Sequence, residues 1–217
     1  RSVIELKNGL QPDTRINTDF EHDSRSVSVL LLLDLSESLN DIVDATNQSI
    51  LELSQEAVSL LAWSVEQLGD NFAIAGFNSN TREQVMYYHI KGYSERWDDT
   101  VKARLANLKA EYSTRMGAAI RHATHYLDLQ KSDKKLMLIL TDGEPSDVDV
   151  KDSEMLIKDT HKAVQECQQK GMYPYCISLD NKADNYVSDI FGSHYSVIDK
   201  IESLPKELPQ LFLSLTK

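Results

Sequence analysis

The chain has little of what marks secreted, membrane-spanning or nucleic-acid-binding proteins. Of its 217 residues only Cys167 and Cys176 are cysteines, too few for the disulfide framework of a small secreted protein. The longest apolar run, residues 29–33, is far shorter than a membrane-spanning helix. We therefore expect free thiols, a cytoplasmic protein and no insertion into a membrane.

Basic residues are also scarce relative to acidic ones. The chain has 34 Asp and Glu residues against 23 Lys and Arg residues, which gives a formal net charge of -11. An acidic surface repels the phosphate backbone of DNA and RNA, so nucleic acid is excluded as an expected partner.

The first 26 residues lack a clear hydrophobic period and carry no basic stretch followed by an apolar one, so we expect no secretion signal there. The chain begins with Arg1 rather than Met, as an excised fragment would. We interpret residues 1–26 as a linker or arm from an upstream domain, and residues 27–217 as one domain.

Buried strands and amphipathic helices alternate along residues 27–217. This alternation predicts a doubly wound α/β domain with a mainly parallel central sheet. The short link at residues 78–81 predicts an antiparallel hairpin partner at one edge of the sheet. The expected strands are residues 27–34, 72–77, 85–90, 135–141, 173–179 and 194–198, and the expected helices are residues 44–68, 97–108, 116–129, 153–170, 187–191 and 201–215.

The first strand is the stretch around which the rest is organised. Residues 27–34 are too apolar to alternate, which is typical of a central strand buried on both faces. The strand ends at Asp34, and Ser36 and Ser38 follow at spacings of two and four residues. In such sheets ligands bind at the carboxyl ends of the strands, so these side chains occupy the expected binding edge.

Two more polar side chains are expected at the same edge. Asp142 follows the buried strand at residues 135–141, and Thr114 lies where the helix at residues 116–129 begins, with Ser113 and Thr114 as its expected cap. The candidate metal ligands are Asp34, Ser36, Ser38, Thr114 and Asp142. All five offer oxygen only, which suits Mg²⁺, with Mn²⁺ or Ca²⁺ as alternatives. The competing interpretation is that each group merely caps a helix or forms a turn.

Three separated motifs resemble the segments that form the metal-ion-dependent adhesion site of a von Willebrand factor A domain. They are D-L-S-E-S at residues 34–38, S-T-R-M-G at 113–117 and L-T-D-G-E-P at 140–145. The resemblance covers about residues 26–217. It implies that the two serines and the threonine bind Mg²⁺ directly, and that the two aspartates bind mostly through water. Leu35 and Glu37 stand where the family often has small residues.

A closer resemblance is to the C-terminal A domain of the CbbO/NorD family. It rests on D-L-S-E-S-L-N-D, S-T-R-M-G-A-A-I-R-H-A, T-D-G-E-P-S-D-V-D-V, Y-V-S-D-I-F-G and L-P-Q-L-F-L-S-L-T-K. It implies an adaptor that brings a client to a MoxR-type AAA+ ATPase hexamer, which the upstream part would hold. The expected client is inhibited Rubisco, bound through an acidic residue at the metal site. The alternative client is nitric oxide reductase.

Charged residues near the motifs have two interpretations each. Arg115 could pair with a client carboxylate or with Glu144. Asp147 and Asp149 could form an acidic rim to the site or lie in a solvated loop.

Histidines and aromatic residues carry weaker signals. His122 and His125 have a spacing that can bind metal, but no further His or Cys joins them, so a solvated or capping role is expected. Tyr93 and Trp97 lie in a polar segment, where they could form an interface or pack against the edge strand.

Catalysis is not expected from this chain. The phosphate-binding G-x-x-x-x-G-K-[ST] motif and the nucleophile motif G-x-S-x-G are both absent from the sequence. A haloacid-dehalogenase-like phosphatase would need a second acid two residues after Asp34, where this chain has Ser36. A Mg²⁺-dependent hydrolase is the alternative from another functional class.

Overall fold

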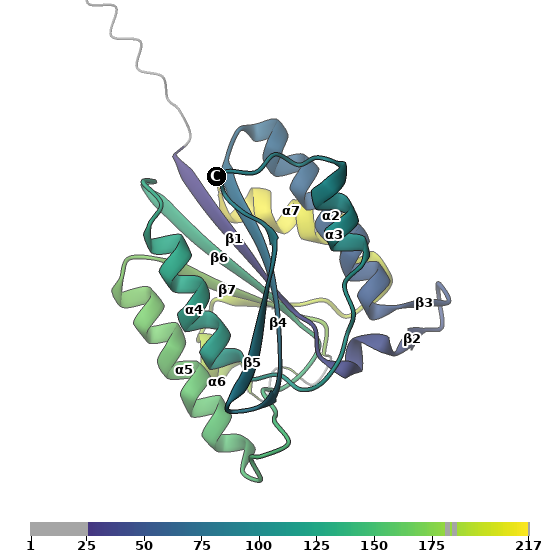
Figure 1. Cartoon of the computed structure of the whole chain (residues 1–217), viewed down its shortest axis with the longest axis vertical. Coiled ribbons are helices and arrows are strands. Elements are labelled where there is room, and N and C mark those ends of the chain that lie inside the picture. The colour runs from purple at the N-terminus through teal and green to yellow at the C-terminus, as the bar shows by residue number, and fades with distance from the viewer. Residues whose placement is uncertain (1–25, 181–182, 184–185, 217) are drawn as a thin grey trace, which may run out of the picture.

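The computed structural model describes residues 26–180, 183 and 186–216. One central sheet is covered on one face by α4, α5 and α6, and on the other by α2, α3 and α7 (Figure 1). The strands are β1 (Val27–Asp34), β2 (Ile42–Val43), β3 (Gln48–Ser49), β4 (Asn71–Thr81), β5 (Gln84–Lys91), β6 (Lys134–Thr141), β7 (Tyr173–Ser178) and β8 (Tyr195–Val197). The α-helices are α2 (Ile50–Leu68), α3 (Asp99–Ala106), α4 (Met116–Asp128), α5 (Ser153–Gln169), α6 (Val187–Phe191) and α7 (Leu204–Leu215); η1 (Glu37–Asn40) and η3 (Ile201–Ser203) are 3₁₀ helices.

The sheet is mainly parallel and has one antiparallel edge strand, as predicted. Its six strands run in the order β5-β4-β1-β6-β7-β8. All neighbouring pairs are parallel except β4 and β5, which form the expected antiparallel edge. The doubly wound α/β fold class is therefore confirmed. The expected linker at residues 1–26 lies, except for Ser26, outside the described residues.

Strand β1 lies in the middle of the sheet, and every one of its residues is buried. Val29, Leu31 and Leu33 pack into the core under α2 and α7, whereas Leu30 and Leu32 pack into the core under α4 and α5. Because both faces of this strand meet helices, its sequence shows no alternation. The strand therefore delivers Asp34 to the carboxyl edge from the centre of the molecule.

The helix expected over residues 44–68 begins six residues later, at Ile50. The residues before it form the small β2–β3 hairpin, in which Asn47 has a φ of 56°. A capping box starts the helix, because the Ser49 hydroxyl accepts from the Glu52 backbone while the Glu52 carboxylate accepts from the Ser49 backbone. The expected end is confirmed, with Gly69 in the left-handed conformation.

The expected link at residues 78–81 is itself part of a strand. β4 continues to Thr81, which pairs with Gln84, so the turn consists of Arg82 and Glu83 alone. The expected terminal helix at residues 201–215 is divided into η3 and α7, and Pro209 lies inside α7. In the described part of the chain, no helix is long and apolar enough to cross a membrane.

Candidate metal centre

Asp34 lies at the end of β1 and is only 3% exposed. Its Oδ1 accepts a hydrogen bond from the Ser36 backbone N–H at 3.0 Å. The Thr114 hydroxyl lies 3.1 Å from both carboxylate oxygens, and the Thr141 hydroxyl donates to Oδ2 at 2.7 Å. Groups from three segments distant in sequence therefore contact the buried Asp34 carboxylate.

The other predicted ligands at this edge, Ser36, Ser38 and Asp142, lie in the same group of side chains as Asp34. The Ser36 and Ser38 hydroxyls are 3.2 Å apart, and the Ser36 hydroxyl lies 3.5 Å from Asp142 Oδ1. Ser36 precedes η1, but its side chain makes no capping hydrogen bond there. The helix-cap interpretation of Ser36 is therefore wrong, and all five predicted side chains are brought together at one edge of the sheet.

Thr114 does not cap α4, as had been expected for Ser113 and Thr114. The residue at the cap position is Arg115, and it makes no side-chain capping hydrogen bond. The Thr114 hydroxyl is directed to Asp34 instead, and the Thr114 backbone exchanges two hydrogen bonds with Ser146, at 2.9 and 3.0 Å. The cap prediction failed because this loop is organised by tertiary contacts rather than by the helix that follows it.

The two carboxylates of the site lie in an unfavourable environment for negative charge. Burial, and then the negative charge of Asp142, raise the pKa of Asp34 to about 7. Burial also raises the pKa of Asp142. Among the described residues no basic side chain forms an ion pair with either group. A buried acid beside a partly buried one, with no basic partner, is an arrangement that a bound divalent cation would stabilise.

The donor set decides which cation fits. The described part of the chain contains no group of three or more His, Cys, Asp or Glu residues placed to hold a metal ion. The site has only two carboxylates and completes its set with three hydroxyls, an oxygen-only set that suits Mg²⁺ rather than Zn²⁺. His122 belongs to an aromatic cluster instead, with its ring centroid 4.6 Å from that of Tyr87.

Leu35 and Glu37, the two departures from small residues, do not fill the site. Leu35 is buried against Gly76 of β4, where an added Cβ would lie 2.4 Å from the Leu35 Cδ1 atom. Because Gly76 has no side chain, it leaves room for the larger Leu35 side chain. Glu37 is exposed, and its backbone N–H donates to the carbonyl of Tyr112 at 2.9 Å.

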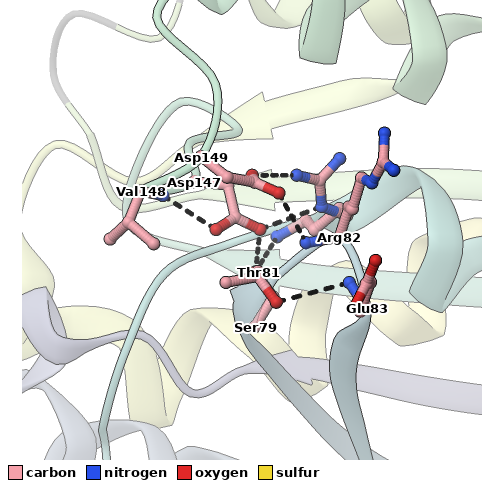
Figure 2. Close-up of polar contacts among 8 residues, drawn as sticks. Ser79, Thr81, Arg82, Glu83, Asp147, Val148 and Asp149 are labelled. Carbon is pink, nitrogen blue, oxygen red and sulfur yellow. Dashed lines mark hydrogen bonds and ion pairs between the residues drawn. The ribbon is translucent and has the colours of Figure 1, made fainter.

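Within the chain, Arg115 does not pair with Glu144, the partner expected for it there. Its Nε lies 2.9 Å from Asp147 Oδ2, and its Nη2 lies 2.5 Å from Asp149 Oδ1. Asp147 is buried, so the two aspartates do not form a free acidic rim. Figure 2 shows their carboxylates directed to the same side, with the exposed Val148 side chain turned away from them.

For Tyr93 and Trp97 the structure favours the packing interpretation over the interface one, because Trp97 is buried and Tyr93 is partly buried. Trp97 is 8% exposed and belongs to the core under α2. Tyr93 packs against the other core cluster.

Sequence reasoning missed two hydroxyls that support the site. Thr141 precedes Asp142 at the end of β6, and its position at the end of a buried strand beside β1 was a usable signal. Ser79 donates to Asp147 Oδ2 at 2.8 Å and accepts from the Arg115 backbone N–H at 3.0 Å. No sequence signal indicated Ser79, because its three partners come from two other loops.

Comparisons with known proteins agree with this geometry. The model of the von Willebrand factor type A domain matches residues 28–208. The chain is 35% identical to Protein NorD of Brucella melitensis biotype 1 over 99% of its length and 34% of that protein. It is 34% identical to Protein NorD of Stutzerimonas stutzeri over 90% of its length and 32% of that protein. The chain thus spans about a third of these relatives, and the expected resemblance to NorD is confirmed.

Solved structures share the fold at low sequence identity. The PilB minor pilin from Streptococcus sanguinis superimposes with a TM-score of 0.73 at 14% identity, over 88% of this chain and 61% of that one. A von Willebrand factor type A protein from Catenulispora acidiphila has a TM-score of 0.58 at 16% identity, over 86% of this chain and 42% of that one. From its sequence match, its sheet topology and these neighbours, the chain belongs to the von Willebrand factor type A domain family.

Proposed function

We propose that this domain binds Mg²⁺ at the carboxyl edge of its sheet and uses the bound cation to capture a carboxylate of a client protein. The observation that carries the proposal is the pair Asp34 and Asp142, a buried acid beside a partly buried one, with no basic partner among the described residues. Three hydroxyls surround this pair. The ligands proposed to hold Mg²⁺ are Asp34, Ser36, Ser38, Thr114 and Asp142.

The residues of the proposed metal site have different roles. Thr141 and the Ser36 backbone hold the Asp34 carboxylate in one orientation. The hydroxyl ligands add no negative charge, so a cation here keeps more of its positive charge than one bound by a cage of carboxylates. When bound, the cation supplies a Lewis acid that accepts an acidic side chain of the client.

We further propose that the domain is the client-binding part of a NorD-like adaptor and is not itself an enzyme. The adaptor would bring its client to a MoxR-type AAA+ ATPase, with most contacts to the ATPase made by regions outside this domain. Similarity to proteins named NorD over nearly the whole chain supports this assignment. It favours nitric oxide reductase as the client over Rubisco, the first expectation from the sequence motifs.

The test is a pull-down with this chain as bait in lysate from its source organism, in Mg²⁺ or in EDTA. Asp34→Ala is the test variant, and Asp99→Ala is the control, because Asp99 is a fully exposed acid on α3. We expect a nitric oxide reductase component to be retained only with Mg²⁺ and intact Asp34, and Asp99→Ala to behave as wild type. Rubisco large subunit retained under the same conditions would identify the other client.

Two results would contradict the proposal. Client retention that is indifferent to Mg²⁺ and to Asp34→Ala would rule out capture through the metal. Turnover of a generic phosphoester that is lost in Asp34→Ala would favour the hydrolase alternative. Circular dichroism of Asp34→Ala must show an intact fold for its loss of binding to count.

A further inference from the structure

A second cluster of polar residues lies directly beside the candidate metal centre. It consists of Ser79, Arg115, Asp147 and Asp149, and we call it the Arg115 cluster. Its members come from three places in the chain: the end of β4, the residue before α4, and the loop after β6. None of them is among the proposed metal ligands, so their role needs its own explanation.

The Arg115 cluster is built around a buried ion pair. The Arg115 side chain is 11% exposed and the Asp147 side chain is fully buried. Asp147 Oδ2 receives both Arg115 Nε at 2.9 Å and the Ser79 hydroxyl at 2.8 Å. Asp147 Oδ1 accepts from the Val148 backbone N–H at 2.8 Å. A buried charge with this many partners holds its surroundings in one arrangement.

Ser79 of the cluster and Ser146, the residue before Asp147, hold the backbone around Thr114. Ser113 exchanges two backbone hydrogen bonds with Ser79, each 2.8 Å long, and Thr114 exchanges two with Ser146. The Arg115 backbone N–H donates to the Ser79 hydroxyl at 3.0 Å. Residues 113–115 are therefore fixed between β4 and the loop after β6.

The tip of the β4–β5 hairpin belongs to this arrangement. The Arg82 backbone N–H donates to Asp149 Oδ2 at 2.9 Å, while Asp149 Oδ1 receives Arg115. Figure 2 shows Asp149, on the loop that also carries Val148, opposite Arg82 of the hairpin turn. The edge hairpin and the two loops thus form one unit beside the candidate metal centre.

We propose that the Arg115 cluster positions Thr114 for the metal, and that Arg115, Asp147 and Ser79 are positioning residues. This inference rests on the proposed function. Because Asp147 and Asp149 compensate the charge of Arg115, the guanidinium adds no net repulsion to a bound cation. The Thr114 hydroxyl can then meet Asp34 and the metal without a separate ordering step.

The experiment measures Mg²⁺ affinity of the 217-residue chain by titration calorimetry. Arg115→Lys keeps the charge but cannot span both carboxylates, and Ser79→Ala removes only a hydroxyl. The control is Arg121→Lys on α4, the helix that follows Arg115, because Arg121 also pairs with two carboxylates, those of Asp159 and Glu166. We expect both test variants to bind Mg²⁺ about tenfold more weakly, as changes to groups behind metal ligands do, and the control to bind as wild type.

A second readout separates positioning from general destabilisation. In Arg115→Lys we expect faster hydrogen exchange at the Thr114 amide, which donates to Ser146, and unchanged exchange in the central strand β1. Wild-type Mg²⁺ affinity in both test variants would overturn this inference alone. A wild-type chain that does not bind Mg²⁺ would overturn the proposed function, and this inference with it.

Discussion

Asp34 and Asp147 are two buried carboxylates. Asp34 ends β1 and Asp147 lies in the loop after the neighbouring strand β6, yet their surroundings differ in one respect. Asp34 is 3% exposed and Asp147 is 7% exposed. Each accepts hydrogen bonds from a hydroxyl and a backbone N–H. Asp147 has a cation from its own chain, Arg115, whereas Asp34 has Asp142 as its charged neighbour.

This difference gives the two carboxylates different roles. Asp147 supports the surrounding loops, whereas Asp34 is proposed to bind a cation. A buried charge is costly unless another charge compensates it. At Asp147 the compensating charge is Arg115 of the same chain and is always present, so Asp147 can hold the loops together. At Asp34 no such charge is present in the described chain, and we therefore propose that the site gains free energy by taking a cation from solution. Three predictions test this contrast, and the first removes the internal cation.

Removing the internal cation tests the Asp147 side of the contrast. Arg115→Ala leaves a carboxylate buried without its partner, which we expect to lower the free energy of unfolding by about 3–5 kcal/mol. Arg121→Ala is the control, because its ion pairs are more than a third exposed and we expect a loss of about 1 kcal/mol or less. Urea denaturation measures both. Equal losses in the two variants would show that Asp147 does not depend on Arg115.

Adding the external cation tests the Asp34 side. Mg²⁺ at a hundred times its Kd should raise the free energy of unfolding by about 2.7 kcal/mol, since only the folded chain assembles the site. Asp34→Asn should lose most of this gain, whereas Asp99→Asn should keep it. Thermal unfolding with Mg²⁺ or EDTA measures the difference. An Asp34→Asn chain that Mg²⁺ still stabilises fully would place the metal elsewhere.

The third prediction concerns the dependence of stability on pH without metal. The pKa of Asp34 is raised from 3.8 to about 7 in the folded chain, so the folded state holds this proton more tightly than the unfolded state. The stabilisation from this proton is complete below about pH 4 and is lost as the pH rises through about 7. In EDTA we expect the wild type to lose stability over this interval more steeply than Asp34→Asn. Parallel curves for the two chains would contradict the prediction.

Much of the fold was accessible from the sequence because it depends on local patterns. The unbroken apolar run before Asp34 predicted a central strand, and burial on both faces confirms it. The start of α2 was predicted six residues too early, because the apolar helical spacing from Ile50 onward does not mark where the helix begins, whereas the capping box of Ser49 and Glu52 does.

The proposed ligand set was also accessible from the sequence, whereas the residues that support it were not. Ser36 and Ser38 follow Asp34 at short spacings, and Asp142 ends a second buried strand, so a parallel sheet brings them together whatever the loops do. The partners of Arg115 could not be chosen from sequence. Glu144, Asp147 and Asp149 all lie within one loop, and only its folded course decides which acids Arg115 reaches.

The sequence by itself determined the α/β fold and the five oxygen side chains at the carboxyl edge, because strand period and spacing are properties of neighbouring residues. The tertiary structure decided that Thr141 holds Asp34 and that Arg115 and Ser79 hold Asp147. It decided these points because buried polar groups bond to whichever partners the packed strands and loops bring within reach, and that choice is made across segments distant in sequence.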